Sequence, residues 1–120
     1  MNANAKAWVA ALRSRRYKQA RGRLRRDDAF CCLGVACELA AQAGVIPRAR
    51  YLSGHGWSYA GHQTLLPPEV AMWLGLKGQG GAVSLLDGLS LVQVNDSGWS
   101  FAKIAELIES EPPGLFAEEQ

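Results

Sequence analysis

The longest regular pattern of apolar positions lies in the stretch Phe30–Gly44, which reads FCCLGVACELAAQAG. From Cys32 onward, apolar residues recur at the three- and four-residue spacing that places them on one face of a helix. Gly44 can adopt the left-handed conformation that ends a helix, and Pro47 prevents its continuation. We therefore predict a central helix over about residues 32–43, covered by other elements on more than one side.

Three further segments carry helical patterns that would let them pack around this central helix. The first has Asn4 as its cap and runs to about Arg15. The second begins at Pro67, since proline is tolerated in the first turn of a helix. The third has Ser100 as its cap and stops at the Pro-Pro-Gly sequence of residues 112–114.

Short extended segments complete the predicted fold. Two strands are expected around residues 19–25 and 29–31, joined by a turn over residues 26–28. A third short strand is expected near residues 82–85. These strands would form a small antiparallel sheet beside the helices.

Two segments allow more than one interpretation. Within residues 83–94, the Asp-Gly pair at 87–88 favours a hairpin, whereas Ser90 can cap a helix, and we prefer one or two helical turns over Leu89–Asp96. Residues 45–64 hold glycines, aromatic residues and both histidines without a regular pattern. They form either a lid over a pocket or a plain surface loop, and we favour the surface loop.

The length of 120 residues and the apolar content of 48% suit one domain over residues 1–120. With the predicted elements, they indicate a mainly helical α+β domain in which the N-terminal, Pro67 and C-terminal helices pack around the central helix. No apolar run approaches the roughly 20 residues that span a bilayer, and the N-terminus lacks the apolar segment of a signal peptide. Three cysteines, two of them adjacent, make a poor disulfide framework, so we expect a cytoplasmic protein without membrane contact.

The net charge of +2 hides an uneven distribution. Residues 1–26 contain nine of the thirteen Lys and Arg residues and no acid, whereas residues 104–120 contain five of the eleven acids and no base. This asymmetry would either draw the two ends of the chain together or leave a basic face for an anionic partner. We call residues 15–26 the basic arm. Its guanidinium groups can pair with phosphate oxygens, and the ring of Tyr17 can stack on a base. The alternative is a solvated basic face.

Candidate metal-binding and catalytic residues form no recognisable set. Cys31, Cys32 and Cys37 lack the Cys-x₂-Cys spacing of structural zinc sites, and His55 and His62 lie in an irregular segment. We therefore predict buried thiols, loop imidazoles and no metal or other cofactor. A cysteine nucleophile would need a neighbouring base and an orienting group, which the spacing does not indicate. A protein without catalytic activity is the favoured interpretation, and enzyme activity stays open.

Residues 95–108 resemble the turn and second helix of a helix-turn-helix, with the pattern Gly-x-Ser-x-x-x-Ile-Ala. A recognition helix should be basic and exposed, yet Glu109 and Glu111 follow this segment. We therefore favour a plain helical hairpin. Asn95 and Asp96 would close its turn through hydrogen bonds from side chain to backbone.

Several of these segments together resemble one group of small proteins encoded by phages and prophages. They are WVAALRS at 8–14, YKQ at 17–19, GRLR at 22–25, FCCLGV at 30–35, LPPEV at 66–70, and NDSG at 95–98 followed by Ser-Phe at 100–101. The resemblance covers most of the chain outside residues 45–62, although members of the group usually have glycine where this chain has Arg15 or Arg16. The resemblance implies a protein encoded by a phage or prophage, and it does not imply a particular reaction. Small accessory proteins from that setting often bind host proteins or sequester nucleotide signals of host immunity.

We therefore predict a non-catalytic accessory protein that binds an anionic partner, with a nucleotide-type small molecule as the first candidate. The predicted ligand-binding residues supply phosphate contacts, stacking and polar hydrogen bonds, and they are Tyr17, Arg21, Arg23, Arg25, Trp57, Asn95 and Asp96. One alternative is a protein–protein inhibitor or assembly factor that binds a host protein and could form a homo-oligomer. Another is a DNA-associated regulator that binds nucleic acid through the basic N-terminal arm.

Overall fold

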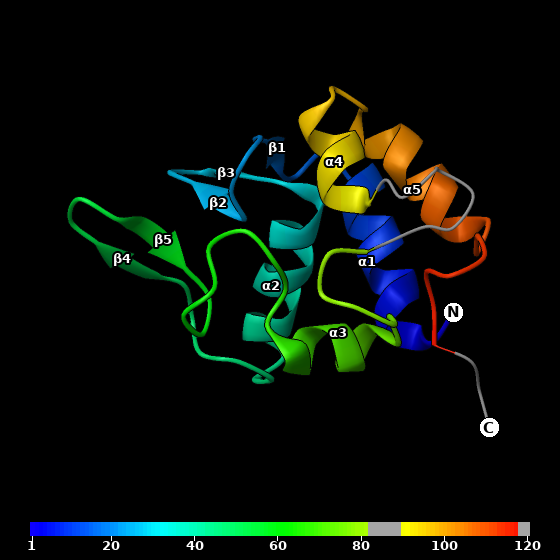
Figure 1. The fold of residues 1–120 in the computed structure, drawn as a ribbon, viewed down its shortest axis with the longest axis horizontal. Coiled ribbons are helices and arrows are strands. Elements are labelled where there is room, and N and C mark those ends of the chain that lie inside the picture. The colour runs from blue at the N-terminus through cyan, green and yellow to red at the C-terminus, as the bar shows by residue number, and fades with distance from the viewer. Residues whose placement is uncertain (82–89, 118–120) are drawn as a thin grey trace.

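The structure is a computed structural model that describes residues 1–81 and 90–117. Its helices and short strands form the predicted α+β domain, with the helices on one side and a projecting hairpin on the other (Figure 1). None of the helices in these described residues is long and apolar enough to cross a membrane.

Three helices pack around a central one, and the N-terminal and Pro67 helices do so as predicted. Helix α2 (Cys32–Gln42) contacts α1 (Ala3–Arg13), α3 (Pro68–Leu74) and α4 (Leu91–Asp96), and α5 (Phe101–Glu109) lies mainly along α1 (Figure 1). The C-terminal helix thus reaches the core chiefly through α1, because α4 occupies the neighbouring face of α2.

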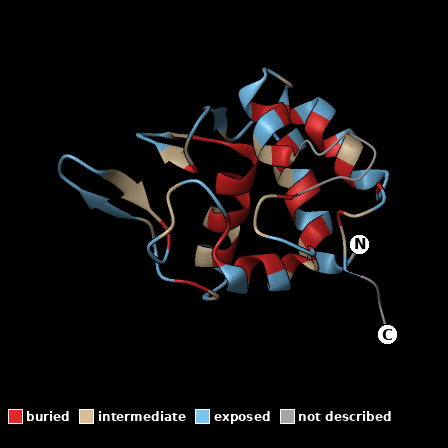
Figure 2. Cartoon of the chain, viewed as in Figure 1, coloured by how far each residue is buried: buried red, intermediate tan, exposed pale blue. Residues whose placement is uncertain are grey.

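Helix α2 is the most deeply buried element, and seven of its eleven residues are buried (Figure 2). The sulfur of Cys31 caps it by accepting the N–H of Gly34 at 3.4 Å. The indole N–H of Trp8 on α1 donates to the carbonyl of Cys32 at 2.9 Å. Cys37 is also buried. These contacts confirm the predicted central helix and the burial of its thiols.

The first helix begins and ends earlier than the sequence predicts. Its cap is Asn2, whose side chain accepts the N–H of Ala5 at 2.8 Å, so the prediction of Asn4 as the cap is wrong. Asn4 instead donates to the carbonyl of Trp73 on α3 at 2.9 Å and ties the two helices together. The helix stops at Arg13, because Arg15 has a φ of 63°, which no helical residue adopts.

The oppositely charged ends of the chain do meet. Helix α1 packs along α5, and the guanidinium of Arg13 lies 2.8 Å from the carboxylate of Glu109. The hydrogen bond from Arg13 lowers the pKa of Glu109, so the pair persists until the solution becomes acidic. Part of the charge asymmetry therefore holds α1 and α5 together. The basic residues that follow Arg13 lie outside α1.

The first sheet is mixed rather than wholly antiparallel. Its order is β1 (Lys18–Gln19), β3 (Ala29–Phe30), β2 (Arg25–Arg26). Strand β2 runs antiparallel to β3 through the predicted turn, whereas β1 runs parallel to β3. The extra parallel strand arises because the chain loops round Gly22 between β1 and β2, with a φ of 80° there.

The segment predicted to be irregular contains a hairpin. Strands β4 (Arg50–Leu52) and β5 (Gly56–Ser58) pair antiparallel with Tyr51 opposite Trp57, and the hairpin projects from the helical body (Figure 1). Its strands are too short for a period of two to stand out in the sequence. Figure 2 shows that the hairpin is largely exposed.

The second ambiguous segment is partly decided. Ser90 caps α4 through a capping box with Gln93, so the helical interpretation is confirmed from residue 90 onward. The strand predicted near residues 82–85 and the Asp-Gly pair at 87–88 lie outside the described residues.

Gly34 lies where α2 passes closest to the segment before β2. A Cβ atom there would lie 1.7 Å from the carbonyl oxygen of Leu24 and 2.7 Å from its carbonyl carbon. Helix propensity alone predicts that Gly34→Ala stabilises the helix by about 1 kcal/mol. Because backbone must move instead, we expect the free energy of unfolding to fall by about 3 kcal/mol or more, as measured by chemical denaturation.

The matched control is Gly44→Ala. Gly44 has a φ of 79°, and nothing lies within 4 Å of the place that a Cβ atom would take there, so only the conformational cost of about 1–2 kcal/mol applies. A Gly34→Ala protein as stable as the parent would contradict the close packing of α2 against Leu24.

Candidate anion-binding site

The basic arm and the β4–β5 hairpin enclose a hollow of about 310 Å³. Strand β2 of the arm contacts strand β5 of the hairpin, which brings residues some 30 positions apart into one wall. Apart from glycines, this arginine hollow is lined by three arginines, one aspartate and three hairpin residues, namely Arg23, Arg25, Arg26, Asp27, Tyr51, His55 and Trp57.

Each of the three arginines is held by a neutral backbone carbonyl. Arg23 donates to the carbonyl of His55 at 2.8 Å, and Arg25 donates to that of Asp27 at 2.7 Å. Arg26 donates to the carbonyl of Arg21 at 2.7 Å. A guanidinium has five N–H donors, so each side chain is anchored by one and keeps others for a ligand.

Among the residues that the structure describes, none of these arginines lies within ion-pair distance of a carboxylate, although Asp27 lines the same hollow. The ion pairs found there join Arg13 to Glu109, Lys18 to Asp28, and the terminal amino group to a glutamate. Three arginines and one aspartate give the hollow a net positive charge, so an anion would be attracted to it.

Two aromatic rings of the hairpin, those of Trp57 and Tyr51, lie next to each other in this hollow. The guanidinium carbon of Arg25 lies 3.7 Å from the centre of the Trp57 ring, so it covers one face of the indole. Trp57 thus orients Arg25. Tyr51 meets Trp57 edge-on, with ring centres 5.3 Å apart, and 55% of Tyr51 is exposed. Tyr51 is the more open ring for stacking.

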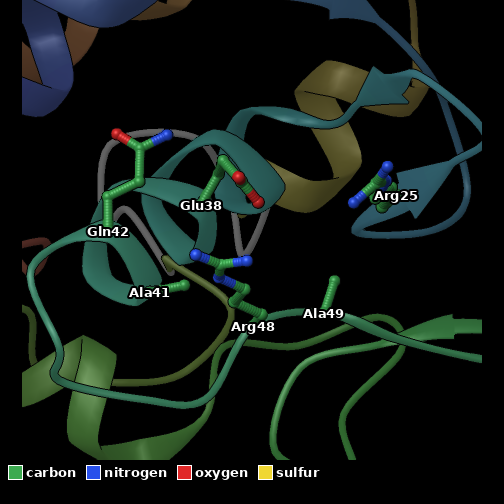
Figure 3. Close-up of a pocket in the computed structure, with 6 residues that line it drawn as sticks. All are labelled: Arg25, Glu38, Ala41, Gln42, Arg48 and Ala49. Atoms are coloured by element: carbon green, nitrogen blue, oxygen red, sulfur yellow. The ribbon is translucent and has the colours of Figure 1, made fainter.

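A second hollow of about 500 Å³ adjoins the first, since Arg25 lines both. Its other polar residues are Glu38 and Gln42 on α2 and Arg48 in the segment after that helix (Figure 3). We call it the Glu38 hollow. The carboxylate of Glu38 accepts the hydroxyl of Tyr59 at 2.7 Å.

Asn95, one of the predicted ligand-binding residues, is buried within the fold. Its side-chain oxygen accepts the amide of Gln19 at 2.9 Å and the backbone N–H of Cys32 at 3.1 Å. Its amide donates to the carbonyl of Ala20 at 2.8 Å. Asn95 thus joins β1, the start of α2 and α4, because one short amide side chain both donates and accepts.

Asp96 likewise binds another segment, since its carboxylate accepts the N–H of Gly22 at 2.8 Å. The expectation that Asn95 and Asp96 close their own turn is therefore wrong. That turn is closed by backbone, with the N–H of Gly98 donating to the carbonyl of Asn95 at 3.2 Å. The guanidinium of Arg21 lies beside Gly98, outside the arginine hollow.

Tyr17 also lies apart from the arginine hollow. Its ring packs edge-on against Phe30 at 5.5 Å and lines a separate hollow with Leu39 and Gln42. Of the predicted site residues, the structure therefore brings together Arg23, Arg25 and Trp57.

Sequence reasoning missed Arg26, Tyr51, Arg48 and Glu38 as site residues. Arg26 continues the basic run, but its sequence context favours a turn. Tyr51 and Arg48 carry no local signal, because their place depends on how the hairpin docks against the arm. Glu38 stands out in the sequence only as a polar residue off the apolar face of the central helix.

The buried thiols do not resemble catalytic nucleophiles. Burial raises the pKa of Cys31 to about 11, and it raises the pKa values of Cys32 and Cys37 further above the ordinary thiol range. At neutral pH these groups are therefore thiols, not the reactive thiolates. Within the described residues, no three His, Cys, Asp or Glu side chains come together as metal ligands.

The fold and the two hollows define a small α+β protein with a basic recess between an arm and a hairpin. The chain belongs to the family described as a domain of unknown function (DUF8296), whose sequence model matches residues 1–112. Neither the curated proteins nor the solved structures provided a match to the chain. Both hollows lie inside the matched region, so they are features of the family domain in this chain.

We expect Asn95→Ala to lower the free energy of unfolding by about 2–4 kcal/mol, because the N–H of Cys32 and the carbonyl of Ala20 would lose their partner inside the protein. Denaturant unfolding measures the change. The control is Asp96→Ala at an exposed neighbouring position, which removes one hydrogen bond and should cost about 1 kcal/mol. Equal losses in the two variants would contradict the bridging role of Asn95.

We expect the three cysteines to resist a thiol reagent in the folded protein at pH 8, because all three are buried. Labelling with a chromogenic disulfide should be slower than in denaturant by at least on the order of a thousandfold, the ratio set by a typical opening free energy. In guanidinium chloride all three should react. Rapid labelling of any thiol in the folded protein would place that side chain at the surface.

Proposed function

We propose that the chain is a non-catalytic binding protein for a phosphate-bearing small molecule of nucleotide type, held in the arginine hollow. The observation that carries this proposal is the set of three guanidinium groups fixed by backbone carbonyls around one recess, without a carboxylate partner among the described residues. Three arginines that share a recess with one carboxylate, that of Asp27, leave a net positive charge that would attract an anion.

Phosphate is the anion that this arrangement suits best. Its oxygens accept the paired, parallel N–H groups of a guanidinium, and each charge-assisted hydrogen bond contributes about 1.5–3 kcal/mol. The arginines of the hollow are already oriented, Arg25 by Trp57 and Arg23 by the hairpin. Less side-chain freedom is lost on binding, so more of that energy becomes affinity.

The hairpin adds an aromatic side chain to this site. Tyr51 is 55% exposed at the edge of the arginine hollow, so its ring is open to contact with a ligand. The arginine hollow measures about 310 Å³, at the small end of ligand sites. It suits the phosphate part of the ligand, with the rest of the molecule extending beyond it.

The resemblance to small phage and prophage proteins supports a role for this binding during phage infection of a bacterium. An accessory protein in the cytoplasm of a bacterial host could bind a nucleotide signal and withhold it from the host's defence. That task needs binding without a reaction. The three cysteine thiols, which would be the candidate nucleophiles, are buried and protonated.

A second candidate function is binding of a host protein through the hairpin. Tyr51 and Leu52 are 55% and 49% exposed there, so a partner that covered them would remove apolar surface from water. A DNA-associated role, the other alternative, would depend on the basic arm and not on helix α5. Helix α5 buries one face in the core and carries Glu106 and Glu109 on its exposed surface, opposite to the basic surface of a recognition helix.

Isothermal titration calorimetry with nucleoside mono-, di- and triphosphates and cyclic nucleotides tests the proposal. We expect the protein to bind at least one of them, and Arg23→Ala to weaken that binding by about tenfold or more. The matched control is Arg50→Ala. It removes the same charge from the neighbouring hairpin, but successive strand side chains point to opposite faces, so Arg50 faces away from Tyr51.

Equal weakening by Arg23→Ala and Arg50→Ala would show attraction by net charge alone and would contradict a formed site. Absence of heat with every nucleotide would also overturn the proposal. Binding to oligonucleotides that grows with their length and falls steeply with salt would instead support the DNA-associated alternative.

A further inference from the structure

The Glu38 hollow is placed to receive the part of a nucleotide that the arginine hollow leaves outside. The two hollows share Arg25, and the Glu38 hollow is the larger at about 500 Å³. Figure 3 shows the carboxylate of Glu38 on α2 and the guanidinium groups of Arg25 and Arg48 around a common space. A ligand with its phosphate on the arginines can therefore extend past Arg25 towards α2.

Glu38 is an unpaired acid in a basic recess. No described cation lies within ion-pair distance of it, although Arg25 and Arg48 line the same hollow. Its carboxylate is instead held by the hydroxyl of Tyr59 at 2.7 Å. Burial, aided by this hydrogen bond, raises the pKa of Tyr59, so its hydroxyl stays a proton donor.

This arrangement leaves acceptor capacity on Glu38 for a ligand. A carboxylate has about four lone-pair sites, and Tyr59 occupies one of them on Oε2. A second phosphate would be repelled by that carboxylate, whereas a group with N–H donors would be attracted. Arg48 and Gln42 supply donors on the same wall for an acceptor atom of the ligand.

Among the common bases, guanine matches this pattern of acceptor and donors. Its Watson–Crick edge carries two adjacent donors, the N1–H and the N2 amino group, beside the O6 acceptor. A carboxylate can accept from both donors, while Arg48 or Gln42 donates to O6. Adenine presents its N1 acceptor at the corresponding place, where it would meet the carboxylate unfavourably. Cytosine and uracil offer one donor there, not two.

We propose that the Glu38 hollow is the base-recognition part of the site and that it selects guanine, with Glu38 as the residue that determines specificity. This inference rests on the proposed nucleotide-binding function and names the ligand class for it. Tyr59 acts as a positioning residue, since it fixes the carboxylate without facing the ligand.

Calorimetry with guanosine, inosine, adenosine and cytidine 5′-diphosphates tests the inference on the full chain. Each bidentate contact to a base edge discriminates by about 1–3 kcal/mol, so we expect guanosine diphosphate to bind about tenfold or more tightly than the adenosine and cytidine compounds. Inosine diphosphate lacks the N2 amino group and should fall between them.

Glu38→Gln should remove most of this preference. It replaces one acceptor oxygen by an amide donor of the same shape, so guanosine diphosphate should bind about tenfold more weakly while adenosine diphosphate changes by less than about threefold. The matched control is Glu69→Gln, which removes the same charge from an exposed position in the first turn of α3. Thermal unfolding confirms that each variant is folded.

The outcomes separate the two proposals. Equal affinity for all four diphosphates, or a preference for adenosine or cytidine, overturns guanine selection and leaves nucleotide binding in place. A guanine preference that survives Glu38→Gln overturns the role of Glu38. Absence of binding by every nucleotide overturns the proposed function, and the inference with it.

Discussion

The arrangement of the whole site depends on the close approach of Leu24 to helix α2. Its carbonyl accepts the N–H of Cys31 at 3.2 Å, its N–H donates to the carbonyl of Gln63 at 2.7 Å, and its side chain is fully buried. Only a glycine at position 34 leaves room for this contact. Leu24 points into the core, whereas its neighbours Arg23 and Arg25 line the arginine hollow.

The same backbone bonds determine what those arginines face. Gln63 follows the β4–β5 hairpin in the chain, so the hydrogen bond from Leu24 fastens the base of the hairpin to the basic arm. Arg25 can then cover Trp57, and Arg23 can reach the carbonyl of His55. The contact of Leu24 with α2 in the core thereby determines which side chains line the charged hollow at the surface.

The basic residues at the start of the chain serve two different purposes. Arg13, at the end of α1, pairs with Glu109 on α5 and holds the two ends of the chain together. The arginines of the hollow have no such partner among the described residues and are held by neutral carbonyls. Net charge alone does not separate these purposes, because both sets belong to one basic segment.

Local pattern determined much of this protein. The helical spacing predicted α2, Ser90 and Ser100 cap the helices that follow them, and the burial of the cysteines follows from their place on an apolar helix. These features depend on residues three or four positions apart, and the sequence displays such neighbours directly.

Tertiary structure decided the rest, because the deciding contacts join distant residues. Asn2 rather than Asn4 caps α1, and the side-chain amides of both residues donate to the carbonyl of Trp73 on α3. Asn95 could serve a ligand, its own turn or the core, and only the position of β1 against α4 shows that it serves the core. The pairing of Tyr51 with Trp57 and the nearness of Glu38 to Arg25 likewise leave no periodic trace in the chain, since each depends on how separate elements dock.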